Sequence, residues 1–333
     1  DSTYIGTWIG RSVFYGSILW NIACIGSVGQ FLANTSYMFQ HTSTEPPVRQ
    51  GLVDGRLFGL FTDPNFAAFT SLLLCYGLWF LLQKAEKKAM RIYLIMSILF
   101  NCIYIVLSNS RTVYLSVIGS VLFFSLFRAY KAGQEQYDRA GSMALHLFKR
   151  GVITILCIIG AYVVIFFPVQ GVAKLVAPDR DTATEMVRDD VNDSNISNNR
   201  FAIWEAYWDL YTDKPVFGFS LRSALPYAEK NYPGGYLDQT KYVTHNSYLS
   251  LLVETGITGF AVFTVFFLMI AVKTFRGCKK KEPVNNTSLI FLTWILSILI
   301  FGLCFHDIFF TMNFETLLFW MGLGYLNVKF ANQ

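Results

Sequence analysis

The sequence has few charged residues and lacks the motifs of common soluble enzymes. Charged side chains make up 15% of its 333 residues, against about a quarter in typical soluble domains, whereas 53% are hydrophobic. It contains neither a glycine-rich phosphate-binding loop nor a serine-nucleophile elbow, so ATP-driven transport and α/β-hydrolase chemistry are not indicated. The six cysteines include no CxxC pair, and none lies in the polar stretch 169–244, which argues against a disulfide framework or a structural zinc site.

Long apolar runs dominate the sequence and predict an all-α polytopic membrane protein. A helix needs about 20 residues to cross a bilayer, and lipid cannot satisfy the backbone groups of an open sheet edge. The predicted spans are residues 8–32, 57–82, 92–108, 112–128, 151–168, 257–275, 288–305 and 309–328. We therefore expect transmembrane helices at 1–168, a large extracytoplasmic loop with amphipathic helices at 169–256, and further transmembrane helices at 257–333. Because the sequence starts at Asp1 and not at methionine, we also expect an N-terminal portion to be missing.

Basic residues indicate how the spans are oriented. They cluster at 84–91, 128–150 and 273–281, three segments that alternate crossings place on one side. The positive-inside rule makes this side cytoplasmic, and the clusters also suit contact with anionic lipid. They account for the net charge of +5 without nucleic-acid binding. The segments that then face outward are 33–56, 108–111, 169–244 and 305–307.

The outer segment 169–244 is too long for a simple connector, and loops of this length are usually functional. Its stretch RDDVNDSNISNNR is typical of a flexible coil. The stretch FAIWEAYWDLY follows and carries aromatic residues at helical spacing, which predicts an amphipathic helix suited to lying along a membrane. Its predicted aromatic face consists of Phe201, Trp204, Tyr207, Trp208 and Tyr211, and Pro215 and Gly218 end the helix.

The four histidines are His41, His146, His245 and His306. His306 precedes Asp307 at an outer helix end, where the pair suits either a structural role or the border of a site. His245 precedes Asn246 and a hydrophobic run that is broken at Gly256–Gly259. From these residues alone, helix capping or a surface position is the more common role for such a histidine, and Asn246 is itself a good N-cap.

Three arginines on the outer side are candidates for binding an anion. Arg111 ends the LSNSR turn at the tip of a helical hairpin, Arg200 opens the aromatic helix, and Arg222 follows the FGFS turn. The guanidinium fork matches phosphate oxygens and keeps its charge, so two such arginines and one histidine would suit a pyrophosphate leaving group and an acceptor hydroxyl. Salt bridges to the carboxylates of the outer loop are the alternative.

Four sequence blocks, in order, resemble those of the bacterial O-antigen ligase and O-antigen polymerase superfamily. They are GLFTDPNFAAFTSLLL (59–74), LSNSRTVYLSVIGSVLF (107–123), NNRFAIWEAYWDLYTDKPVFGFS (198–220) and THNSYLSLLVETGITGF (244–260). The resemblance implies a GT-C-type helical bundle in the plasma or inner membrane. Such an enzyme transfers a glycan from undecaprenyl diphosphate to a sugar hydroxyl on the outer face, without a metal or other cofactor.

The resemblance also implies roles for individual residues. Arg111 and Arg200 match the family's arginines in the SR turn and at the start of the loop helix, where they would bind the diphosphate. His245 matches the histidine before asparagine and would accept the proton of the attacking hydroxyl, with inverted stereochemistry as the result. The remaining site candidates are Arg222, which falls on no family motif, and the supporting residues Trp204 and Asn246.

Within the superfamily we favour a polymerase that adds a growing chain to a lipid-linked repeat unit. A ligase that attaches the finished chain to its final acceptor is the alternative. The expected partners are the undecaprenyl-diphosphate-linked donor, the glycan acceptor, membrane lipid and a chain-length regulator, with no nucleic acid among them.

Two further classes of function stay open. Asp179 and Asp181 have the DxD spacing with which some membrane glycosyltransferases hold Mg²⁺ or Mn²⁺ on a diphosphate, although an acid-rich loop yields this short pattern by chance. A non-enzymatic polysaccharide or lipid transporter would need a charged path through the spans, and the sequence has few charges there.

Overall fold

The computed structural model describes residues 2–40, 48–134, 140–176, 199–279, 286–306 and 308–330. The chain divides into two compact units. The first unit comprises Asp1–Asp190 and Pro283–Ser297, and the second comprises Val191–Glu282 and Ile298–Gln333. The sequence candidates His41, Asp179, Asp181 and Asp307 lie outside the described residues.

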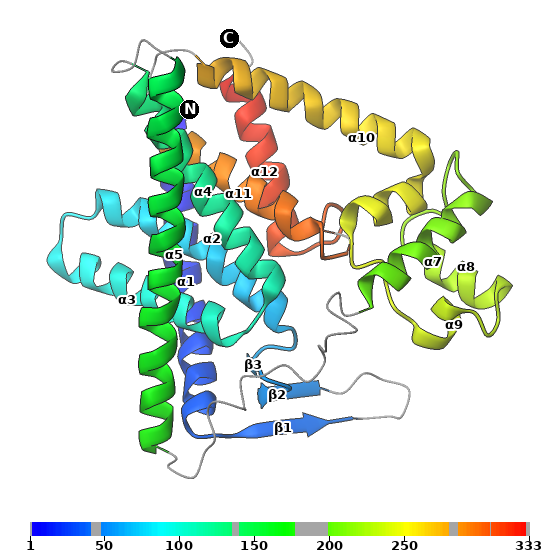
Figure 1. Ribbon diagram of the computed structural model, residues 1–333, viewed down its shortest axis with the longest axis horizontal. Coiled ribbons are helices and arrows are strands. Elements are labelled where there is room, and N and C mark those ends of the chain that lie inside the picture. The colour runs from blue at the N-terminus through cyan, green and yellow to red at the C-terminus, as the bar shows by residue number, and fades with distance from the viewer. Residues whose placement is uncertain are drawn as a thin grey trace. The chain divides into compact units, whose positions relative to one another are not determined.

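Long helices make up most of the first unit (Figure 1). They are α1 (Ser2–Leu32), α2 (Pro64–Lys84), α3 (Lys88–Leu107), α4 (Arg111–Gly133), α5 (Ala140–Val176) and the first part of α11 (Asn286–Gly302). Helix α1 packs against α2 and α3, and α4 packs against α2 and α5. Buried polar side chains join these apolar helices: Asn21 Nδ2 donates to Ser97 Oγ at 2.6 Å, and Trp294 Nε1 donates to the Leu73 carbonyl at 2.9 Å. Such bonds hold helices together where lipid offers no hydrophobic driving force.

A small antiparallel sheet in the segment between α1 and α2 was not predicted. Its strands are β1 (Ser36–Phe39), β2 (Val48–Val53) and β3 (Arg56–Gly59), in the order β1-β2-β3. Asp54 and Gly55 join β2 to β3 and both have positive φ, as a type I′ hairpin requires. Consequently the span predicted at 57–82 starts in a strand, and α2 begins only at Pro64 behind its N-cap Asp63.

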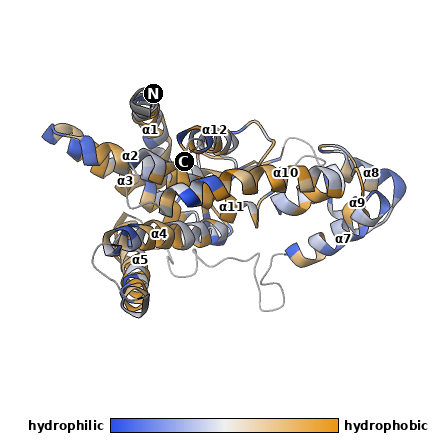
Figure 2. Ribbon diagram, turned by 90° about the horizontal axis from the view of Figure 1, so that it is seen from above, coloured by the Kyte–Doolittle hydropathy of each residue, from blue (hydrophilic) through white to orange (hydrophobic). Residues whose placement is uncertain are grey.

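The second unit is a group of short helices against one end of a long one. It contains α7 (Arg200–Asp213), α8 (Ala224–Asn231), α9 (Tyr236–Thr240), α10 (Ser247–Lys279), α12 (Phe314–Lys329) and the end of α11. Figure 1 shows α7, α8 and α9 beside the start of α10, and Figure 2 shows that α10 is mostly hydrophobic whereas the short helices mix both kinds of residue. A hydrophobic core joins them: Ile203, Tyr207, Leu210, Phe219, Ala224, Ala228, Leu237 and Val253.

Helix length and composition confirm the predicted all-α polytopic membrane class. Within the part of the chain that the structure describes, six helices are long and apolar enough to cross a membrane: Thr7–Leu32, Pro64–Lys84, Lys88–Leu107, Arg111–Gly133, Gly141–Val176 and Ser247–Cys278. The remaining two predicted spans correspond to shorter helices, α11 with 17 residues and α12 with 16. At 1.5 Å per residue such helices are about 25 Å long, which is less than the usual 30 Å hydrocarbon core. Their crossing, and the GT-C assignment, stay predictions.

The predicted glycine break in the sixth span is a kink at Gly256, where φ is 65° and ψ is −176°. The loop that follows α7 pairs with the interrupted backbone on both sides of the kink. Phe219 and Ser220 N–H groups donate to the Val253 and Glu254 carbonyls at 3.2 and 2.8 Å. Ile257 and Thr258 N–H groups donate back to the Pro215 and Val216 carbonyls at 2.8 and 3.2 Å. The loop 215–220 therefore satisfies the peptide groups that the kink leaves without helical partners.

This close backbone contact needs glycine on both sides. Gly218 and Gly256 have positive φ, and an added Cβ would lie 2.5 Å from Glu254 backbone atoms or 2.3 Å from the Val216 carbonyl oxygen. We expect Gly218→Ala and Gly256→Ala each to cost about 2 kcal/mol or more and to lower the thermal unfolding temperature in detergent. The matched control is Gly324→Ala in α12, where an added Cβ meets no atom within 4 Å. Unfolding temperatures equal to that of the wild type in both kink variants would contradict this account.

Candidate functional site

Hydrogen bonds from α7 hold the segment that leads to His245. Trp204 Nε1 donates to the Thr244 carbonyl at 3.0 Å, and the Tyr207 hydroxyl donates to the Tyr242 carbonyl at 3.1 Å. His245 itself is half-buried and has a positive φ of 46°, which is uncommon for a residue with a side chain. Burial and nearby carboxylates raise the pKa of Tyr207, so its hydroxyl keeps its proton and stays a donor. The two α7 side chains thus hold the backbone directly before His245.

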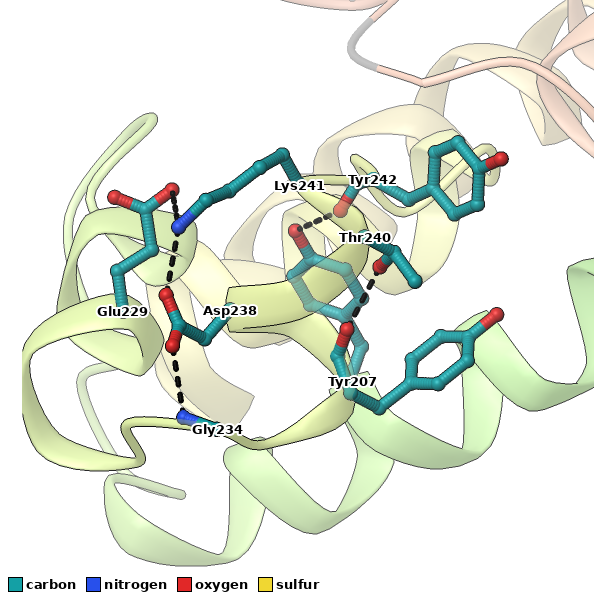
Figure 3. A network of polar contacts seen from close by, with 8 residues as sticks. Tyr207, Glu229, Gly234, Asp238, Thr240, Lys241 and Tyr242 are labelled. Atoms are coloured by element: carbon teal, nitrogen blue, oxygen red, sulfur yellow. Dashed lines mark hydrogen bonds and ion pairs between the residues drawn. The ribbon is translucent and has the colours of Figure 1, made fainter.

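A second network fixes the same segment from the side of α8 and α9 (Figure 3). Lys241 Nζ lies 2.6 Å from Asp238 Oδ1 and 3.3 Å from Glu229 Oε1, and Gly234 N–H donates to Asp238 Oδ2 at 2.8 Å. Lys241 and the Gly234 N–H lower the pKa of Asp238, which keeps this carboxylate charged. These contacts are exposed, so each adds little stability, but together they set where the chain leaves α9.

Asn246 caps α10, as the sequence predicted. Its Oδ1 accepts the N–H groups of Tyr248 and Leu249 at 3.0 and 3.1 Å. Ser247, the next residue, is buried and donates through Oγ to the Phe305 carbonyl at 2.7 Å. Because neighbouring residues cap the helix and anchor it, the His245 side chain is not needed for either purpose.

The surroundings of His245 hold its imidazole uncharged at neutral pH. Burial, a positive charge on His306 and the charge of Arg200 together lower the pKa of His245 to about 4. The His306 ring centroid lies 5.9 Å from that of His245, and Tyr242 lies on another side at 6.3 Å. A neutral imidazole can accept a proton, so the geometry is compatible with a general base.

Arg200 is the first residue of α7, and Asn199 before it has a φ of 60°. The positive end of the helix dipole and the guanidinium therefore coincide near His245. The five aromatic residues predicted to form one face of this helix differ in exposure. Tyr207 is buried and Trp204 packs on the core, whereas Phe201 and Trp208 are 69% and 54% exposed. The outward pair leaves two aromatic rings available at the surface of this unit.

Arg222 lies in the second unit too, on an exposed turn with a positive φ of 59°. Its Nη2 donates to Thr311 Oγ1 at 3.4 Å, which ties the turn after loop 215–220 to the loop between α11 and α12. The salt bridge to a loop carboxylate, the alternative from the sequence, stays a prediction.

Arg111 belongs to the first unit, where it is the first residue of α4. Ser110 is the N-cap, and its Oγ also donates to Asn65 Oδ1 at 2.7 Å. Arg56 of β3 donates to the same Asn65 atom at 2.6 Å and to the Ser108 carbonyl at 3.3 Å. The sheet therefore braces the turn that carries Arg111, a support that the sequence analysis did not foresee.

The structure brings four sequence-predicted site residues together in the second unit: Arg200, Trp204, His245 and Asn246. It adds His306, which the sequence analysis left as either structural or bordering a site. No group of three His, Cys, Asp or Glu side chains within the described ranges is arranged to hold a metal ion. The pair Asp179 and Asp181 falls outside those ranges.

A family model described as O-antigen ligase matches residues 96–264, slightly more than half of the chain. The chain belongs to the O-antigen ligase family. This confirms the resemblance that the four sequence blocks indicated, and the matched range includes Arg111, Arg200, Arg222 and His245. Members of the O-antigen ligase family are glycosyl-transfer enzymes, so the chain has an O-antigen ligase- or polymerase-type function in a membrane. Neither the curated proteins nor the solved structures gave a significant match.

The charge environment of His245 can be measured directly. We expect its imidazole to titrate near pH 4 in the wild type and at higher pH in Arg200→Gln, because that variant removes a nearby positive charge. Nuclear magnetic resonance of histidine-labelled protein in detergent, with His245→Gln for assignment, would follow the titration. Arg276→Gln, which removes an exposed arginine near the other end of α10, is the matched control and should leave the midpoint in place. A wild-type midpoint near the ordinary value of 6.5 would contradict the prediction.

Proposed function

We propose that the protein transfers a glycan from an undecaprenyl-diphosphate-linked donor to a sugar hydroxyl on the outer face of the plasma or inner membrane. The observation that carries this proposal is the neutral imidazole of His245 beside the guanidinium of Arg200. One group can accept a proton while the other binds an anion, and glycosyl transfer from a diphosphate needs both.

In the proposed mechanism, Arg200 and Arg111 bind the diphosphate and stabilise the negative charge that develops on the leaving oxygen. Each begins a helix, so the helix dipole adds to the charge of the side chain. Arg222 is a further diphosphate ligand on the exposed turn. Trp204 positions the base through its bond to the Thr244 carbonyl.

His245 removes the proton from the acceptor hydroxyl as the hydroxyl oxygen attacks the anomeric carbon. The bond from that carbon to the diphosphate oxygen breaks on the opposite face, so the configuration inverts. Arg200 lowers the basicity of His245 in the free protein, and bound diphosphate would offset that charge. The base would thus become stronger when the donor is present, and no metal is required.

Polymerase and ligase chemistry share this step and differ in the acceptor. We favour a polymerase that extends a lipid-linked chain, with a chain-length regulator as a further partner. The family description favours the second candidate, a ligase that attaches the finished chain. Products from a deletion strain separate the two: single attached units indicate a missing polymerase, and long unattached chains indicate a missing ligase.

The assigned roles predict the behaviour of variants in transfer assays with purified protein, a lipid-diphosphate-linked glycan and an acceptor. We expect His245→Gln to lower turnover by about 10²–10⁴-fold and Arg200→Gln by about 10²–10³-fold. Arg200→Lys should recover only part of the loss, because a lysine lacks the bidentate fork. The controls are His146→Gln and Arg276→Gln, which should keep wild-type turnover. Near wild-type turnover in His245→Gln would rule out its role as the base.

A metal-dependent mechanism makes the opposite prediction for the acidic pair. If the proposed mechanism holds, EDTA leaves turnover unchanged, and so does Asp179→Asn combined with Asp181→Asn. A loss of turnover in EDTA that Mg²⁺ or Mn²⁺ restores would support the DxD alternative.

A further inference from the structure

His306 lies in the loop between α11 and α12, and this loop is anchored to the beginning of α10. Ser247 Oγ donates to the Phe305 carbonyl at 2.7 Å and accepts the Ile308 N–H at 3.1 Å. One buried hydroxyl therefore holds the residues on both sides of His306, and it lies only two positions after His245.

Aromatic contacts orient the His306 ring. It stacks on Phe305 with centroids 5.4 Å apart and an angle of 20° between the planes. Phe305 in turn stacks on Phe301 at 4.8 Å, so the support reaches into the end of α11. The His306 ring meets His245 edge to face, at 5.9 Å and 88°. The two imidazoles are thus held in fixed relation by a helix start and an aromatic stack.

We propose that His306 is a positioning residue of the transfer site, which acts by charge to keep His245 in its unprotonated form. Two imidazoles this close cannot both carry a proton without mutual repulsion, so protonation of His306 opposes protonation of His245. This inference rests on the proposed role of His245 as the base.

Other charged or titratable groups around the pair must be considered as well. Arg200 of α7 acts on His245 in the same direction, and the Tyr242 ring packs against it. Buried Glu254 lies further along α10, where its charge acts on Tyr207. Arg222 reaches the His306 loop through Thr311, and Asp307 lies outside the described residues. The two contributions differ in one respect, because the charge of Arg200 is the same at every working pH whereas the charge of His306 depends on pH.

The pH profile of kcat/KM tests the proposal, because it reports the free enzyme. In His306→Gln the acid limb of the kcat/KM profile should move to higher pH by about one unit, because the charge that repels a proton on His245 is gone. This shift does not depend on the maximum value of kcat/KM. In His306→Lys a permanent cation replaces the imidazolium, so the acid limb should stay at or below that of the wild type. His146→Gln is the histidine control and should leave the profile unchanged. An unshifted acid limb in His306→Gln would overturn the proposal.

Failure of this inference can be told apart from failure of the proposed function. If His245→Gln retains turnover, His245 is not the base and the proposed function fails. If His245→Gln is inactive and the pH profile of His306→Gln is unshifted, only the charge coupling between the two histidines is refuted. A measurement on the unaltered protein covers the case in which His306 variants do not fold. In histidine-labelled wild type, the His245 and His306 signals should each show an inflection at the titration of the other ring. Two independent single-step titrations would reject the coupling.

Discussion

An apolar helix that breaks must find partners for its peptide groups, and this constraint organises the second unit. Loop 215–220 supplies the missing partners at the Gly256 kink. Its N–H groups donate to two carbonyls of α10 before the kink, and its carbonyls accept from two N–H groups of α10 after the kink. The same loop continues from α7, whose Trp204 and Tyr207 hold the carbonyls just before His245. These hydrogen bonds therefore fix the short first part of α10 relative to α7. The histidine lies between these two elements, and its φ is positive.

The electrostatics of the site follow from the same arrangement. Burial, together with the charges of His306 and Arg200, lowers the pKa of His245. The imidazole is then neutral and can accept a proton, but it is a weak base in the free protein. An anionic donor resolves this conflict under the proposed mechanism, because diphosphate bound at Arg200 cancels the charge that depresses the basicity. The base would then be strongest only when the leaving group is in place, and this would limit unproductive proton transfer while the site is empty.

Apolar run length was enough to predict the membrane class and most helices, because lipid leaves few other solutions. The residues that mark turns and helix starts were harder to interpret. The Asp54–Gly55 pair is a type I′ hairpin signal, and Asp63–Pro64 is a helix start, yet the apolar residues between them resembled part of a span. The exposure of the aromatic residues of α7 was not predictable from their spacing, because packing by α8, α9 and α10 decides which of them are buried. The His245–His306 pairing joins residues far apart in the chain, so no local pattern could indicate it.

The two arginine motifs have a common physical explanation that neither spacing nor composition states. In SNSR and NNR an asparagine adopts positive φ, at Asn109 and at Asn199, and a helix begins with the arginine one or two residues later. Asparagine tolerates the left-handed conformation better than most residues, so it can turn the chain sharply into a helix. The turn places the guanidinium at the positive end of the helix dipole, where side chain and backbone attract the same anion. The asparagines therefore contribute to both motifs, because they form the turn that places the positive charge at a helix start.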